Sequence, residues 1–359
     1  MYWLLLLFCP LLWASDWFPA PVVADGQPQS YQPQAMANHP WRLCALLPHG
    51  KDHYWWGVSW GLQQEAERQG VLLGIYEAGG YEHLDRQRQQ LQNCLAQQAD
   101  ALIIGAISSH GLNDLLLQAK QQGLVLIDLI NGISSDRIDA RSSVSFADMV
   151  DHSLNYLLSQ QVQPQHQLAW LPGPAKAAWV QDAEQGLKLR ESSLPWTVLH
   201  AGYGAPDKFS QATLVRQLFR QHKPDYVLAN AVAAAVAAEY LQNHPEQHTG
   251  IVSFYTNPDV VQLLENNQLL AAATDSPVLQ ARIAVDLAIR ALEQRPYPKQ
   301  VSPQIRLLTA SSIKELDLQQ IIAPRQQWMI RQQLPALTEQ VQSLQPKHKS
   351  PASPKPGTM

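Results

Sequence analysis

From Trp41 onward, short apolar runs alternate along the chain with longer amphipathic stretches. The short runs fit buried strands, and the longer stretches repeat apolar residues at helical spacing. The predicted strands are 41–47, 71–77, 101–105, 125–129, 167–171, 197–203, 226–229, 250–254 and 270–274. The predicted helices are 57–69, 84–97, 112–122, 148–161, 175–190, 210–221, 231–242, 258–267 and 277–294. This alternation predicts parallel sheets with helices on both faces.

Roughly ten such units exceed one open sheet of ordinary size, so the pattern predicts an α/β fold with two lobes. Residues 139–145 follow the fourth strand without a helix of their own and suit a first crossing between lobes. Residues 271–275 and the Pro-rich stretch 296–303 are candidates for two more crossings. We therefore expect an N-terminal lobe and a C-terminal lobe, made respectively of 41–143 plus 275–296 and of 146–270 plus 303–330.

The first residues are typical of an export signal. Trp3–Trp13 is almost wholly apolar and is followed by the small residues Ala14 and Ser15, whereas a membrane span needs about 20 apolar residues. We expect a signal peptide over 1–20 and a location in the periplasm. The two ends of the remaining chain lack periodicity and predict an irregular lead-in and a disordered tail, which are 16–40 and 340–359.

Composition narrows the function further. The 359 residues are 46% hydrophobic and 16% charged, with a net charge of -4 and no basic stripe, which argues against a nucleic-acid partner. No metalloprotease, nucleophile-elbow or phosphate-loop motif occurs, and the twelve His residues lack metal-ligand spacing. The sequence therefore predicts a protein that is not an enzyme and that carries no cofactor.

Two cysteines, Cys44 and Cys94, remain once the leader is removed. In an oxidising compartment an even pair favours a disulfide. Free cysteines are also commonly buried as small apolar residues. Both interpretations stay open at this stage.

Aromatic residues gather where the predicted strands end. In open α/β sheets, ligands bind outside the carboxyl ends of the strands, so these loops are the expected site. The candidate ligand-binding residues are Asp52, Tyr54, Trp55, Tyr81, Asn131, Phe146, Tyr255 and Asp275. The alternative for any single ring is a place in the core. Trp55 and Trp56 are neighbours and should point apart, so at most one of them need face a ligand.

Ring faces suit two kinds of ligand. Each ring attracts a methylated ammonium group by about 0.5 to 2 kcal/mol, and rings also stack on the C–H faces of sugars. A ligand with a cationic methylated end and a strongly accepting oxygen would need a fixed hydrogen-bond donor in the same pocket. Both ligand classes remain possible from the residues alone.

At these loops the sequence resembles the TorT family of periplasmic binding proteins. The similarity runs from about residue 41 to 308, and its most specific parts are Lys51–Asp52 with Tyr54–Trp55, and Glu77–Tyr81. Further matching stretches are Trp41–Leu46, Leu171–Pro174, Val252–Tyr255 and Ala272–Asp275. The resemblance implies a type I periplasmic binding fold, no catalysis, and a complex with the periplasmic domain of a histidine kinase of the TorS type.

The resemblance also implies an aromatic box that holds trimethylamine N-oxide. Tyr54, Trp55, Tyr81 and Tyr255 match rings of that box, with Asp52 as a nearby polar residue. One position departs from the family, because Phe146 stands where TorT has a Trp. Phe keeps an apolar ring but lacks the indole N–H. If that N–H donates to the oxygen of the ligand in the family, this chain must supply another donor or prefer another ligand. The alternative is a sugar- or autoinducer-type binding protein of the same fold.

Overall fold

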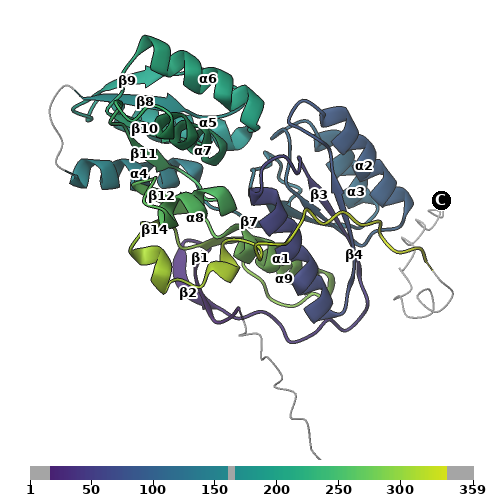
Figure 1. The fold of residues 1–359 in the computed structure, drawn as a ribbon. Helices are drawn as coiled ribbons and strands as arrows, with labels where there is room; N and C mark the ends of the chain where they lie inside the picture. Colours follow the sequence, from purple (N-terminus) through teal and green to yellow (C-terminus); the bar gives the residue numbers. More distant parts are fainter. Residues whose placement is uncertain (1–16, 161–165, 338–359) are drawn as a thin grey trace, which may run out of the picture.

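The computed structural model describes residues 17–160 and 166–337. They form two lobes, each built on one sheet with helices packed against it (Figure 1). The predicted two-lobed α/β fold is confirmed. Within the described residues, none of the helices has the length and apolar character that a membrane crossing requires. The predicted leader lies outside the described residues up to position 16, and the predicted tail 340–359 lies wholly outside them.

The first lobe contains an eight-stranded sheet in the order β2-β1-β13-β7-β6-β5-β3-β4. Its strands are β1 (Ala20–Ala24), β2 (Gln27–Tyr31), β3 (Arg42–Leu47), β4 (Leu72–Glu77), β5 (Ala101–Ile104), β6 (Val125–Leu129), β7 (Ala140–Ser142) and β13 (Gln300–Pro303). Pairing is parallel from β4 through to β13, and β1 is antiparallel to both β13 and β2. The helices of this lobe are α1 (Tyr54–Gln69), α2 (Leu84–Ala96), α3 (Asn113–Gln121) and α9 (Pro277–Leu292).

The second lobe contains a six-stranded sheet in the order β14-β12-β11-β10-β8-β9. Its strands are β8 (Gln167–Leu171), β9 (Thr197–His200), β10 (Tyr226–Ala229), β11 (Gly250–Ser253), β12 (Ala271–Thr274) and β14 (Arg306–Leu308). All of these pairs are parallel except β12 with β14. The helices are α4 (Phe146–Ser159), α5 (Ala178–Glu191), α6 (Lys208–Gln221), α7 (Ala231–Gln242) and α8 (Pro258–Glu265).

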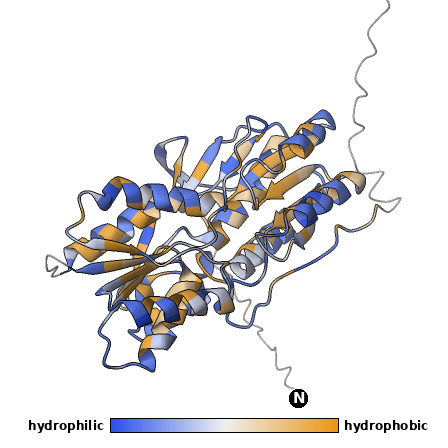
Figure 2. Ribbon diagram, turned by 90° about the horizontal axis from the view of Figure 1, so that it is seen from above, coloured by the Kyte–Doolittle hydropathy of each residue, from blue (hydrophilic) through white to orange (hydrophobic). Residues whose placement is uncertain are grey.

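The core of each lobe lies between its sheet and its helices. Figure 2 shows hydrophobic residues concentrated along the strands, while the helices alternate between hydrophobic and hydrophilic faces. Helix α9 is buried along almost its whole length and packs against α1. Gly61 allows this close approach, because a Cβ at that position would lie 2.5 Å from the carbonyl oxygen of Val278.

Short segments carry the chain between the two sheets. They connect β7 to α4, β12 to α9, and β13 to β14, and they comprise residues 143–145, 275–276 and 304–305. At the first crossing, the hydroxyl of Ser145 caps α4 by accepting the N–H of Asp148 at 3.1 Å. A carboxylate oxygen of Asp182 accepts the N–H groups of Phe146 and Ala147, which fixes the start of the helix against α5.

The lead-in is structured, contrary to the expectation of an irregular stretch over 16–40. Strands β1 and β2 extend the first sheet, the Trp17 indole donates to Glu65 at 2.8 Å, and the Tyr31 hydroxyl donates to Asp286 at 2.7 Å. Residues 17–20 therefore pack with the first lobe in this structure, within the span 1–20 that is predicted as a leader. The hairpin gave no periodic signal because β2 is polar and almost fully exposed.

The chain after β14 also departs from the predicted boundary at residue 330. A short 3-10 helix, Ser312–Glu315, contacts α8 of the second lobe, but the next one, Leu318–Gln320, contacts α9 of the first. Gln332 then forms an antiparallel bridge with Ile75, and the C-terminal segment passes over the first lobe (Figure 1). The segment was misassigned because its irregular backbone has no periodicity to follow.

A disulfide joins Cys44 of β3 to Cys94 of α2. Both residues are buried in a second apolar cluster of the first lobe. The bond ties α2 to β3, the strand next to the edge strand β4.

Candidate functional site

A small cavity lies between the lobes, where the strand ends of the two sheets face each other. The cavity is small, with about 280 Å³ of space between its wall atoms when the part open to solvent is included. The first lobe contributes His49, Asp52, Tyr54, Trp55, Tyr81, Ile130 and Asn131. The second lobe contributes Phe146, Trp179, Pro206 and Tyr255.

Six aromatic rings form most of the wall of the cavity. Tyr255 follows β11 and lies at the centre of the contacts, with its ring centroid 5.5 Å from Tyr54, 5.7 Å from Trp179 and 6.4 Å from Phe146. These contacts are edge-on, which suits the ring quadrupoles. Of the eight predicted residues, all except Asp275 line this one cavity, and they come from both lobes.

Asp52 joins the two lobes by hydrogen bonds. One of its carboxylate oxygens accepts the hydroxyl of Tyr255 at 2.7 Å, and the other accepts the amide of Asn257 at 2.8 Å and the backbone N–H of Tyr54 at 2.9 Å. Burial raises the pKa of Tyr255, and the nearby charge of Asp52 raises it further. The hydroxyl therefore stays protonated and remains a donor. The carboxylate of Asp52 therefore bonds the first lobe to two residues of the second lobe.

Asp275 does not line the cavity, so its predicted place in the ligand site is corrected. It lies at the second crossing, fully buried, and accepts the Tyr54 hydroxyl and the Gln280 amide, each at 2.6 Å. Burial raises the pKa of Asp275 to about 6. The sequence placed it correctly at a strand end but could not show that its side chain turns behind Tyr54.

Asn131 positions Tyr81. Its amide donates to the Tyr81 hydroxyl at 3.0 Å and to the carbonyl of Ala106 at 2.8 Å. Both amide protons are thereby used within the first lobe. Burial raises the pKa of Tyr81, so this hydroxyl also stays protonated.

Sequence reasoning missed four residues of the wall: His49, Ile130, Trp179 and Pro206. His49 follows β3 by two residues, so the strand-end argument that found Asp52 could have included it. Trp179 lies in the first turn of α5, eight residues beyond the end of β8, where no strand-end argument reaches. Its ring centroid is 5.4 Å from that of Phe146.

The adjacent Trp55 and Trp56 point to different places. Trp55 lines the cavity, whereas the indole of Trp56 donates to the carbonyl of Gly50 and its ring lies 5.4 Å from that of Trp328, which is largely exposed. Only one of the pair faces the cavity.

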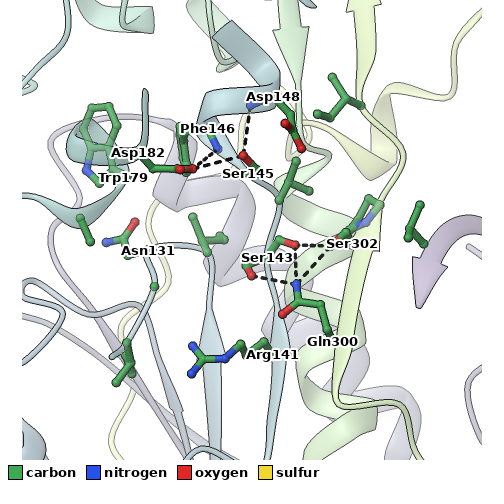
Figure 3. Close-up of a pocket in the computed structure, with 18 of the residues that line it drawn as sticks. Asn131, Arg141, Ser143, Ser145, Phe146, Asp148, Trp179, Asp182, Gln300 and Ser302 are labelled. Atoms are coloured by element: carbon green, nitrogen blue, oxygen red, sulfur yellow. Dashed lines mark hydrogen bonds between the residues drawn. The ribbon is translucent and has the colours of Figure 1, made fainter. Parts of the chain in front are cut away.

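A wider pocket adjoins this cavity at the crossings. Figure 3 shows Asn131, Phe146 and Trp179, which both pockets share, and a polar wall in which Gln300 donates to Ser143 and Ser302. Its unfilled space is about 1660 Å³ and is open to solvent. The smaller cavity is the candidate binding site because it is enclosed by rings from both lobes. The described part of the chain holds no group of three or more His, Cys, Asp or Glu side chains arranged for a metal ion.

Two α/β lobes, three short crossings and an enclosed cavity between the lobes define a bilobal solute-binding protein. The model of the periplasmic binding protein domain matches residues 44–296, and the chain belongs to this family. The periplasmic protein TorT of Escherichia coli (strain K12) is 30% identical over 80% of this chain and 83% of its own length. This likeness confirms the resemblance to the TorT family.

Two solved structures are similar in sequence and fold. An ABC transporter solute binding protein from Bradyrhizobium sp. BTAi1 with bound bis-tris is 35% identical, with a TM-score of 0.77 over 88% of this chain and 99% of that one. The complex of the TorS sensor domain with TorT in the presence of TMAO is 29% identical, with a TM-score of 0.72 over 81% of this chain and 99% of that one.

Proposed function

We propose that this protein is a periplasmic sensor that binds trimethylamine N-oxide, or a related methylated amine, and regulates a histidine kinase of the TorS type. The observation that carries the proposal is the ring of six aromatic side chains around one small cavity between the lobes. The proposed role is binding and signalling without catalysis.

The chemistry of the walls suits a compact methylated cation. Each ring face attracts such a group by about 0.5 to 2 kcal/mol, and the attraction is larger when water is excluded. A sugar would instead need several polar groups free to meet its hydroxyls, and here Asp52 and Asn131 are already bonded to protein groups.

Closure of the lobes links binding to signalling. The rings of Tyr54, Trp55 and Tyr81 belong to one lobe, and those of Phe146, Trp179 and Tyr255 to the other. A ligand that contacts both sets binds the closed form better, and that difference in affinity is what shifts the balance towards closure. The likeness to TorT, which is known in complex with the TorS sensor domain, supports a kinase as the receiver of this change.

Calorimetry with trimethylamine N-oxide tests the ligand. We expect saturable binding to the wild type, weakened about 2- to 30-fold in Tyr81→Ala and in Trp55→Ala because each loses a ring of the wall. Trp56→Ala is the matched control, since the neighbouring ring lies outside the cavity, and it should bind as the wild type does. An absence of heat at millimolar ligand would overturn the assignment of this ligand.

Co-purification tests the partner. A TorS-type sensor domain, purified with this protein in the presence and absence of the N-oxide, should be retained, and the ligand should change the retained amount. Failure to retain the sensor domain under both conditions would contradict the kinase proposal while leaving the ligand proposal intact.

The second candidate is a binding protein that delivers its solute to a transporter. It is favoured by one observation, the 35% identity to an ABC transporter solute binding protein. A thermal-shift screen of sugars, polyols and methylated amines separates the ligand classes. Stabilisation by sugars alone would favour the transporter-type or autoinducer-type alternative.

A further inference from the structure

Most polar donors around the cavity are already committed to protein acceptors. The hydroxyl of Tyr54 donates to Asp275 and that of Tyr255 donates to Asp52. Both amide protons of Asn131 are used. A ligand oxygen must therefore find its donor elsewhere on the wall, and Phe146 offers none.

His49 has a free donor in a defined state. The side chain is 1% exposed, and burial lowers the pKa of His49 to about 4, so the imidazole is neutral near pH 7. Its Nδ1 accepts the backbone N–H of Lys51 at 3.2 Å, which places the single ring proton on Nε2. Among the described residues, this Nε2 has no hydrogen-bond partner.

The ring of His49 also lies among the aromatic walls. Its centroid is 5.3 Å from that of Tyr81 and 6.3 Å from that of Trp55, and all three residues line the same cavity. Buried donors without partners are rare in folded proteins, and one at a cavity indicates a group that a ligand completes. We infer that the Nε2–H of His49 donates a hydrogen bond to the oxygen of the ligand and so selects amine oxides over methylated ammonium ions of the same shape.

This inference rests on the proposed function and names a hydrogen-bond donor for the ligand oxygen, which Phe146 cannot supply. The competing donors are the hydroxyl of Tyr81, which accepts the Asn131 amide and keeps its own proton to donate, and the indole N–H groups of Trp55 and Trp179. Among the described residues, the indole Nε1 of Trp179 has no hydrogen-bond partner either, so Trp179→Phe is included in the test. The donor of His49 is oriented by the backbone of its own loop.

The test compares trimethylamine N-oxide with tetramethylammonium, in which a methyl group replaces the oxygen. Calorimetry measures both ligands on the wild type, His49→Leu, His49→Gln and Trp179→Phe. We expect the wild type to prefer the N-oxide, and His49→Leu to lose about 10- to 100-fold in affinity for the N-oxide while its affinity for tetramethylammonium changes less than threefold. His49→Gln retains an N–H donor and should recover most of the preference.

A preference for the N-oxide that persists in His49→Leu, or that is lost only in Trp179→Phe, would overturn the inference. Equal binding of both ligands by the wild type would also overturn it, yet would leave the binding of methylated amines standing. Binding of neither ligand would remove the proposed function itself and this inference with it.

Nuclear magnetic resonance of the wild type gives a second test that needs no variant. The Nε2–H proton of His49 should move downfield when trimethylamine N-oxide is added and not when tetramethylammonium is added. The same response to both ligands would contradict a hydrogen bond to the oxygen.

Discussion

The two halves of the cavity are built differently. In the first lobe, hydrogen bonds within that lobe and the hinge hold the side chains: Asn131 holds Tyr81, the Lys51 backbone holds His49, and Asp275 holds Tyr54. In the second lobe, the cavity side chains of Phe146, Trp179 and Tyr255 are held mainly by ring contacts with one another.

The difference indicates a division of roles. We expect the cavity side chains of the first lobe to keep their positions before the lobes meet. Closure then brings the rings of the second lobe to them. The polar connection between the halves is Asp52, with Tyr255 and Asn257 as its partners. Loss of a hydrogen bond that holds a ring of the first half should therefore mainly alter stability, and loss of a hydrogen bond at the connection should mainly alter affinity.

The largest effect is expected from Asp52→Ala. The change leaves the Tyr255 hydroxyl and the Asn257 amide without a partner in the closed form, at a cost of about 2 to 4 kcal/mol. Calorimetry should show a loss of roughly 30- to 1000-fold in affinity for trimethylamine N-oxide. Lys51→Ala, a change at the exposed neighbour that pairs with Glu82, is the control and should bind normally. An equal loss of affinity in the two variants would contradict the role of Asp52 as the connection between the halves.

The ligand-free first half should show opposing pH dependences. The pKa of His49 is lowered to about 4, so the unfolded chain gains the proton first and stability falls by about 3 kcal/mol as the pH drops from about 7 to 4. The pKa of Asp275 is raised to about 6, so the folded protein binds this proton before the unfolded chain does. The contribution of Asp275 to folding stability therefore grows as the pH falls below about 6 and is lost as the pH rises through that value. The free energy of unfolding, measured with urea as a function of pH, should therefore change its slope in opposite directions in His49→Gln and Asp275→Asn.

In that experiment, His49→Gln should become relatively more stable towards low pH, and Asp275→Asn relatively less stable. Curves of both variants that run parallel to the wild type would show that neither group is buried in the ligand-free protein.

A matched pair of hydroxyl deletions should separate affinity from stability. Tyr255→Phe keeps its ring but loses the bond to Asp52 across the lobes, so affinity should fall about tenfold with little change in the melting temperature. Tyr54→Phe loses its bond to Asp275 at the hinge, so its melting temperature should fall and its affinity should change less. Calorimetry and thermal melting on both variants test this prediction. A larger loss of affinity in Tyr54→Phe, with a larger fall in melting temperature in Tyr255→Phe, would contradict it.

The smallest effect is expected at the rim of the cleft. The Nδ1 of His53 in the first lobe lies 3.2 Å from a carboxylate oxygen of Asp259 in the second. The hydrogen bond with Asp259 raises the pKa of His53, so the charged pair favours closure at lower pH and is lost as the pH rises through that raised value. Because both side chains are exposed, the affinity of the wild type relative to His53→Gln should change only about two- to threefold between mildly acidic and mildly basic pH. A constant ratio would show that the pair has no part in closure.

The sequence predicted those features that follow from periodicity and from the position of residues at strand ends. The apolar runs located the strands β3 to β6 and β8 to β12 but missed the short strands β7, β13 and β14 beside the crossings. The strand-end argument found Asp52, Tyr81 and Tyr255. The hairpin of β1 and β2 has no such pattern, because its stability comes from pairing with β13 and from hydrogen bonds to carboxylates distant in sequence. Trp179 was missed because it approaches the cavity from a helix.

The direction of a side chain and its protonation state also lie beyond a sequence pattern. Asp275 stands at a strand end like the other candidates, yet its carboxylate turns away from the cavity to Tyr54. His49 was one of twelve scattered histidines until burial and the Lys51 backbone gave it a defined donor.

A crystal structure of the protein grown with trimethylamine N-oxide tests the central claim most directly. We predict one ligand between the lobes, with its methyl groups against the rings of Tyr81, Trp179 and Tyr255. Density for the ligand in the open pocket at the crossings, or an empty cavity at saturating ligand, would contradict the account.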